Sequence, residues 1–166
     1  MKACCDPMTL AAQPRNWGRI ATQALVAGIA GGFLIELYRY LTTFLPQHTG
    51  LMAAWQWIAS VAIGPVALTN PSFAWFGLLA HAVVSIGWAG GYAYFAQTQP
   101  FVNARWPLSG LVYGLVVYFF MQILLLGARA FVFPATAVIL LNALVAHAVF
   151  FGLPVALVVA RMSRKT

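Results

Sequence analysis

Residues 20–45 read IATQALVAGIAGGFLIELYRYLTTFL, an apolar run that ends at Pro46. A helix needs about 20 apolar residues to cross the hydrocarbon core of a bilayer, so this run predicts a membrane-spanning helix. The run contains Glu36, the only glutamate of the chain, and Arg39 follows three residues later. Ionisable residues are costly in lipid and usually face the inside of a helix bundle. We therefore expect several spans packed around this charged pair.

The composition of the whole chain indicates an integral membrane protein. Hydrophobic residues make up 63% of the 166 residues and charged residues only 7%, against roughly a quarter charged in soluble domains. Three further apolar runs, 73–95, 108–126 and 135–160, are long enough to span a bilayer. The sequence predicts an all-α bundle of four transmembrane helices, which forms a single domain over residues 17–166 after a polar tail at residues 1–16.

A shorter apolar run, residues 51–68, does not fit a full span. Gly64 and Pro65 interrupt it and leave about 13 residues of helix, too few to cross the bilayer. The pattern favours an interfacial or re-entrant helix over residues 51–64, between the first and second spans. Its interfacial candidates are two tryptophans and two polar residues on a weakly polar stripe: Trp55, Trp57, Gln56 and Ser60.

The nine Lys and Arg residues decide between four spans and five, because cytoplasmic loops carry an excess of these residues. With four spans and the N-terminus inside, seven of the nine are cytoplasmic, and only Arg39 and Arg129 lie outside. A fifth span would leave four inside and five outside. We predict four spans, an outside segment at 46–70, cytoplasmic termini and an uncleaved first span. The net charge of +7 is then explained by the orientation of the chain in the membrane and by attraction to anionic lipid headgroups. No nucleic-acid partner is expected.

Small residues recur at four-residue spacing in every predicted span. This spacing allows transmembrane helices to approach closely, so it predicts tight packing within the bundle. Self-association into a homo-oligomer is a compatible use of the same motifs. The packing candidates are Gly28, Gly32, Gly87, Gly91, Gly110, Gly114 and Gly152.

Polar residues within the spans form the candidate site for a ligand, an ion or a proton. They are Glu36, Arg39, His81, Ser85, Gln122, Asn142 and His147. At about 1.5 Å of rise per residue, most lie about 6 to 15 Å from the outer ends of their helices, and His147 lies about 18 Å deep. Because the small residues map mainly to the other half, this placement predicts a polar pocket that opens to the exterior.

Each polar residue also has a structural interpretation. Glu36 and Arg39, three residues apart, can form a salt bridge within one helix, which lowers the cost of either charge in lipid. The histidines, Asn142 and Gln122 can form hydrogen bonds between helices. The functional interpretation makes Glu36 an ion- or proton-binding carboxylate and makes the histidines ligand-binding groups or proton carriers. The sequence leaves both interpretations open.

Motifs typical of soluble enzymes are absent: there is no G-x-S-x-G, P-loop or G-x-G-x-x-G, and we expect no enzymatic activity. Two histidines on separate helices could ligate a haem, and Glu36 with both could bind zinc, but no spacing strengthens either assignment. We therefore expect no cofactor. Adjacent Cys4 and Cys5 in the polar tail, with no nearby histidine, predict neither a disulfide nor a metal site.

Four groups of short motifs occur in a characteristic order along the chain. They are Trp55 to Ser60 before Gly64-Pro65, LLAH at 78–81 before Gly87-Trp88-Ala89, LVYG at 111–114 before Tyr118, and Asn142 to His147 before Gly152-Leu153-Pro154. This order resembles bacterial inner-membrane proteins related to the YagU family. The resemblance implies a multi-spanning inner-membrane protein without an assigned reaction. It favours four positions for testing: Gln56, His81, Asn142 and His147. The chain departs from similar proteins in the third span, where Leu-Leu-Leu-Gly follows Gln122 in place of an Asn soon followed by Pro.

Three functional hypotheses fit these observations. The first is a non-enzymatic membrane protein whose outward-facing pocket binds or passes a small ligand, an ion or a proton. The second is a small dimeric transporter that uses Glu36, although Arg39 one turn away would compete with a cationic substrate. The third is a structural or assembly subunit that docks through its outer tryptophans.

Overall fold

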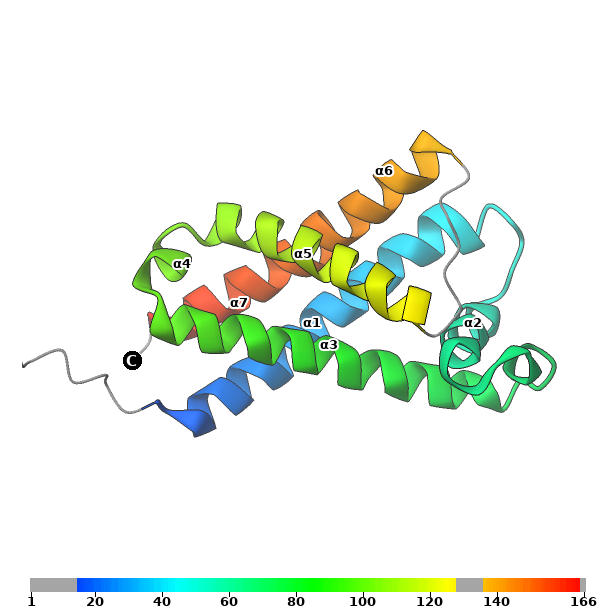
Figure 1. The fold of residues 1–166 in the computed structure, drawn as a ribbon, viewed down its shortest axis with the longest axis horizontal. Helices are drawn as coiled ribbons and strands as arrows, with labels where there is room; N and C mark the ends of the chain where they lie inside the picture. Colours follow the sequence, from blue (N-terminus) through cyan, green and yellow to red (C-terminus); the bar gives the residue numbers. More distant parts are fainter. Residues whose placement is uncertain (1–14, 128–135, 165–166) are drawn as a thin grey trace, which may run out of the picture.

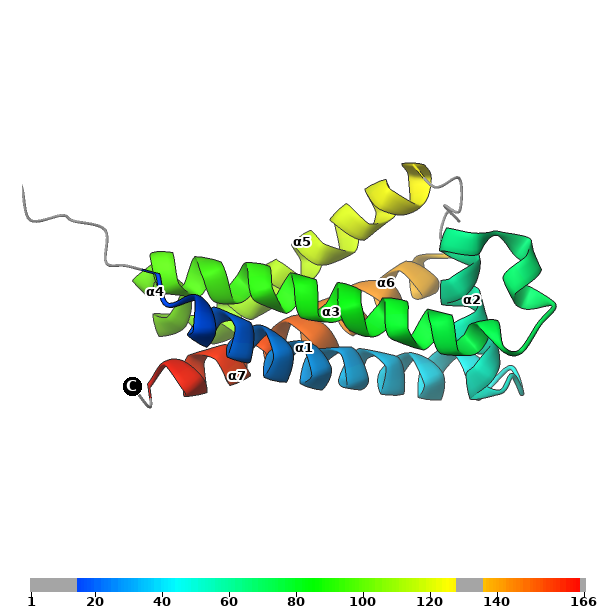
Figure 2. The same cartoon turned by 90° about the horizontal axis from the view of Figure 1, so that it is seen from below.

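The fold is an elongated bundle of helices that run lengthwise beside one another (Figure 1, Figure 2). The structure is a computed structural model and describes residues 15–127 and 136–164, which form helices and no strands. The predicted tail therefore lies almost wholly outside the described residues, and so do Cys4, Cys5 and Arg129. Four helical rods are long and apolar enough to cross a membrane: Trp17–Phe44, Phe73–Thr98, Trp106–Gly127 and Ala137–Ser163. The predicted all-α, four-span fold with one additional short apolar helix is confirmed.

Ten helical elements build the described part of the chain. In order they are α1 (Trp17–Arg39), η2 (Tyr40–Phe44), α2 (Leu51–Ile63), η3 (Pro65–Leu68), α3 (Phe73–Thr98), α4 (Pro100–Ala104), α5 (Trp106–Gly127), α6 (Ala137–Val145), η4 (Ala146–Gly152) and α7 (Leu153–Ser163). The first begins at a side-chain cap, since Asn16 Oδ1 accepts a hydrogen bond of 2.9 Å from the backbone N–H of Arg19. The start of α1 and the end of α7 lie at one end of the bundle, and α2 lies at the opposite end, which we call the α2 end (Figure 1).

Two stretches of π-helix interrupt the first and last rods just before prolines. In η2, Leu45 N donates to Tyr40 O, five residues back, at 2.9 Å, and Pro46 follows. The second stretch, η4, comes just before Pro154. Proline lacks an N–H and its ring clashes with the carbonyl four residues earlier, so a wider turn relieves the conflict. As a result, the prolines influence how nearby side chains are rotated about both helix axes.

The short helix α2 ends at Ile63, and Gly64 caps it with a φ of 90°, in a region that residues other than glycine rarely adopt. The chain then returns through η3 toward α3. Gln56 joins α2 to η3, because its Nε2 donates to Ala67 O at 3.0 Å and to Leu68 O at 3.3 Å. Ser60 donates within its own helix, to Trp57 O at 2.7 Å. Both polar residues of the predicted interfacial stripe thus bond locally, Gln56 to η3 and Ser60 within α2.

Glycines allow close contact where helices cross. A Cβ on Gly28 would collide with the backbone of Ile86 in α3, and a Cβ on Gly32 would collide with Ser85. In the other half of the bundle, three glycines of α5 and η4 face each other or the opposing backbone without room for a Cβ: Gly110, Gly114 and Gly152. Glycine packing therefore joins α1 to α3 and α5 to the last rod.

Two of the predicted packing glycines behave differently. Gly91 faces only the hydroxyl of Tyr113, 3.1 Å from where its Cβ would lie. Gly87 is exposed, with no atom near its Cβ position, so it does not pack closely against another helix within the described chain. Conversely, the spacing did not reveal Gly31, which faces Val155, or Gly77, which faces the carbonyl of Trp55.

Helices α3 and α5 meet through aromatic side chains. Near their middle, Tyr113 Oη donates to Trp88 O at 2.5 Å, and the ring of Trp88 meets Phe120 edge to face, with 5.1 Å between centroids. Toward α4, Tyr92 Oη and Ser109 Oγ are hydrogen-bonded at 2.7 Å. Beyond these contacts the C-terminal half of α5 diverges from α3 toward the α2 end (Figure 2).

Candidate functional site

A cavity of about 460 Å³ lies among α1, α2, α3, α5, α6 and η4. Its lining includes all the polar residues that the sequence proposed for a ligand or proton site: Glu36, Arg39, His81, Ser85, Gln122, Asn142 and His147. Five elements supply these side chains, and among them only α6 and η4 follow each other directly, as parts of one helical rod. Tertiary packing therefore creates the cluster.

The remaining walls of the cavity are mostly apolar. Trp88 of α3 and Val117 and Met121 of α5 contribute to its sides. The short helix α2 contributes Trp57 and Ile58, so this helix closes part of the cavity. Apolar walls around a few convergent polar groups are the usual composition of a small-molecule site.

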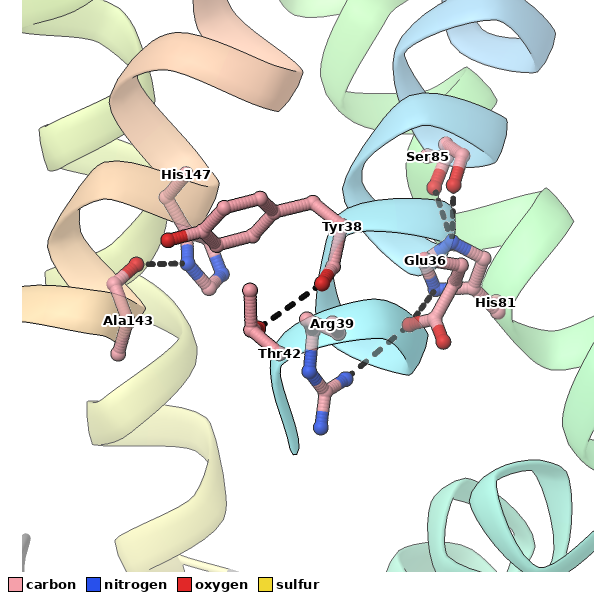
Figure 3. A network of polar contacts seen from close by, with 9 residues as sticks. Glu36, Tyr38, Arg39, Thr42, His81, Ser85, Ala143 and His147 are labelled. Atoms are coloured by element: carbon pink, nitrogen blue, oxygen red, sulfur yellow. Dashed lines mark hydrogen bonds and ion pairs between the residues drawn. The ribbon is translucent and has the colours of Figure 1, made fainter. Parts of the chain in front are cut away.

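Glu36 is buried in the wall of the cavity, with 5% of its surface exposed. Its Oε1 accepts a hydrogen bond of 3.1 Å from Arg39 Nη1, so the salt bridge suggested by the spacing is formed (Figure 3). Its Oε2 is buried and has no hydrogen-bond partner among the described residues. A buried carboxylate oxygen without a donor is destabilising, and a ligand or water that donates to it would remove that cost.

His81 lies beside the same carboxylate. Its Nε2 is 3.1 Å from Gly32 O, which can only accept, so this nitrogen carries the proton. In the neutral ring Nδ1 then presents a lone pair, and this atom lies 3.8 Å from Glu36 Oε1. Glu36 and His81 therefore form a close polar pair on one wall of the cavity.

Ser85 lies one turn further along α3, with its Oγ 3.4 Å from His81 Nε2. It is buried, and it also contacts the Gly32 position of α1. The contact with Ser85 holds the His81 ring against α1, and Nδ1 of the ring points toward the Glu36 carboxylate (Figure 3).

Arg39 connects the cavity to α2. Its guanidinium lies over the rings of Trp57 and Phe44, at 5.5 and 5.8 Å from their centroids, where cation–π attraction applies. Its side chain is 27% exposed, and its hydrogen bond within the described chain is the one to Glu36. The remaining N–H groups are available to water or a ligand.

His147 approaches from the opposite side of the cavity from His81 (Figure 3). Its Nδ1 is 2.8 Å from Ala143 O and must donate to it, so Nε2 is a hydrogen-bond acceptor in the neutral ring. The edge of the Tyr118 ring packs against it, with centroids 5.2 Å apart. The π-helical turn η4 carries this histidine.

Asn142 and Gln122 complete the polar lining with neutral amides. Asn142 Nδ2 makes two long contacts, 3.4 Å to Thr42 Oγ1 and 3.5 Å to Thr43 Oγ1. Gln122 has no hydrogen bond to any of the described residues. Both amides can therefore adjust to a bound molecule.

The two histidines do not converge with Glu36 on one point. Among the residues that the structure describes, no three His, Cys, Asp or Glu side chains form a group that could hold a metal ion. Glu36 and His81 form a close pair, and His147 belongs to the other wall.

Several residues of functional or structural interest could not be assigned from the sequence alone. Trp57 was expected only as an interfacial residue, and the place of Trp57, Trp88 and Tyr118 in the cavity wall carries no sequence signal that separates them from lipid-facing aromatic residues. Gln23 did carry a signal, a polar group inside the first apolar run. It is fully buried toward the end opposite α2, where its Nε2 donates to Val159 O at 3.4 Å.

These features define a class: an all-α bundle with four membrane-spanning-type helices around a largely apolar cavity that contains a buried charged pair. Comparisons with protein-family models, curated proteins and solved structures gave no match. The resemblance to proteins related to the YagU family stays a prediction.

Proposed function

We propose that this protein is a membrane-embedded, non-enzymatic binding protein that holds a small amphipathic molecule in the cavity. One observation carries the proposal: Glu36, whose buried Oε2 has no partner among the described residues, belongs to the lining of a largely apolar cavity. The volume of about 460 Å³ is within the range of small-molecule sites, roughly 300 to 1,000 Å³. The polar part of the ligand lies against Glu36, Arg39 and His81, and its apolar part lies against α3 and α5.

The contact between Glu36 and Arg39 favours binding of a neutral molecule over exchange of a cation. An exchanger needs a carboxylate that alternates between proton and cationic substrate. Here a guanidinium already occupies one carboxylate oxygen at 3.1 Å, and it would repel a second cation. This geometry ranks the transporter hypothesis below the binding hypothesis.

Tryptophan fluorescence tests the binding proposal, because Trp57 and Trp88 line the cavity. The probes are 4′-bromobiphenyls that carry a polar group at the 4-position, added to the protein in lipid nanodiscs. We expect at least one probe to quench fluorescence saturably, with one probe bound per chain. Quenching that only rises linearly with every probe, as partition into lipid would give, would refute the proposal.

A pair of neighbouring valines provides the matched control. Val84 lines the cavity and Val83 does not, although both are exposed on α3. Val84→Phe narrows the cavity and is expected to weaken probe binding about tenfold or more, a loss of about 1.4 kcal/mol. Val83→Phe adds the same volume outside the cavity and should bind the probe like the unmodified protein.

We also propose a bacterial inner-membrane location with both termini in the cytoplasm and the α2 end outside. The start of α1 and the end of α7 lie at the end of the bundle opposite α2 (Figure 1), which agrees with an even number of crossings. The excess of Lys and Arg near the opposite end from α2 indicates that this end faces the cytoplasm.

Labelling with a membrane-impermeant maleimide tests this orientation. In intact spheroplasts we expect no labelling of the native Cys4 and Cys5 until the membrane is permeabilised. A chain with Cys4→Ser and Cys5→Ser that carries Gln47→Cys should be labelled without permeabilisation. The reverse pattern would show the opposite orientation.

A further inference from the structure

Several polar atoms of the cavity lining that lack partners are hydrogen-bond acceptors. The best defined is Glu36 Oε2, on a residue with 5% of its surface exposed. From this buried, unpartnered acceptor we infer that the cavity selects an uncharged alcohol or phenol whose hydroxyl group donates to Glu36 Oε2. This inference rests on the proposed binding function and specifies its ligand class.

Two further acceptors lie along the cavity wall. His147 donates through Nδ1 to Ala143 O, so its Nε2 offers a lone pair and has no partner within the described chain. Asn142 uses its amide nitrogen toward Thr42 and Thr43, which leaves its carbonyl oxygen to accept. A second hydroxyl on the same ligand would therefore also find an acceptor.

The paired charges of the cavity disfavour a charged ligand. Glu36 is the acidic side chain of its lining and Arg39 is the permanently charged basic one, and they pair with each other. A cation would be attracted by Glu36 but repelled by Arg39. An anion would be attracted by Arg39 but repelled by Glu36. Either would also add an unpaired charge within an apolar region, which is costly.

An uncharged donor avoids both costs. Its O–H satisfies the orphaned carboxylate oxygen, and a hydrogen bond to a charged group is stronger than one between neutral groups. A molecule that can only accept, such as an ether or an ester, would leave Oε2 unsatisfied. The same cavity should therefore discriminate a hydroxyl from its methyl ether.

Four probes with one apolar body test this inference on the unmodified protein in nanodiscs. They are 4′-bromobiphenyls with a hydroxyl, a methoxy, a carboxylate or an aminomethyl group at the 4-position. By tryptophan quenching at pH 7, with each affinity corrected for partition into protein-free nanodiscs, the hydroxyl probe should bind about tenfold or more tightly than the methoxy probe. Both charged probes should bind more weakly than the hydroxyl probe.

The Glu36→Gln variant provides a second test of the hydrogen bond between the ligand hydroxyl and residue 36. The guanidinium of Arg39 needs an acceptor, so it keeps the amide oxygen and directs the amide N–H₂ to the position of Oε2. The preference for hydroxyl over methoxy should therefore disappear. Thr22→Ala, which removes a hydroxyl of α1 outside the cavity lining, should retain the preference.

The outcomes separate the ligand class from the binding function. If the methoxy, carboxylate or aminomethyl probe binds as tightly as the hydroxyl probe or tighter, the ligand class is wrong and the binding function stands. If no probe binds saturably, both fail. A hydroxyl preference that survives in Glu36→Gln would move the recognition away from Glu36 and overturn the inference.

Discussion

The Gly114→Val variant is expected to lose most of its folded protein. The Cβ of any residue at this position would collide with the backbone of His147 and Ala148 in η4, where no side-chain rotation can relieve the overlap. Overpacking in a dense interior costs about 1 to 3 kcal/mol, and a collision with backbone belongs at or above the upper end. Forcing α5 away from η4 would also open the wall that carries Tyr118 and His147.

Gly87→Val is the matched control for this variant. It introduces the same side chain at the same kind of helical position, but nothing lies near the Cβ of Gly87. Its effect should stay within about 0.5 kcal/mol. The folded fraction of both variants is measured by titration with a denaturing detergent, and coincident transitions would show that α5 and η4 do not cross as closely as described.

The second large effect is expected from Arg39→Met. This change leaves the buried carboxylate of Glu36 without its cationic partner. Removing one member of a buried ion pair typically costs about 3 to 5 kcal/mol, because the remaining charge stays desolvated. Arg39→Met also removes the cation–π contact with Trp57, so α2 should loosen at the same time.

A double-mutant cycle isolates the charge effect. The double variant Glu36→Gln, Arg39→Met contains no uncompensated charge, so it should be more stable than Arg39→Met alone. Glu36→Gln alone should cost less than Arg39→Met, since Arg39 is 27% exposed and keeps its aromatic contacts. If the double variant is instead the least stable of the three, the pair is not the source of the effect.

The sequence predicted the arrangement of spans well because membrane helices are specified by long apolar runs. The third rod, α5, covers Trp106–Gly127 where the hydropathy indicated residues 108–126. The short helix α2 ends at Ile63, immediately before the Gly64-Pro65 break. These boundaries depend on local chemistry, namely proline, glycine and the thickness of the hydrocarbon core.

The site was predicted only as a set of polar residues. Glu36 and Arg39 lie on one helix, so their salt bridge followed from the helical period. The contact between Glu36 and His81, the opposite placement of His147 and the unpartnered Oε2 did not follow. They depend on the rotation of each helix about its axis, which glycine crossings and proline-associated π turns set.

By itself, the sequence determined the number and limits of the membrane-spanning helices, the short helix between the first two and the polar residues available within the apolar runs. Only the tertiary structure decided which face of each helix points inward. Gly87 shows the difference, because its spacing matches a packing motif and yet it lies on the exposed surface. The physical reason is that lipid and the bundle interior are both apolar, so the periodicity of hydrophobic residues that marks the buried face of a soluble helix is weak here.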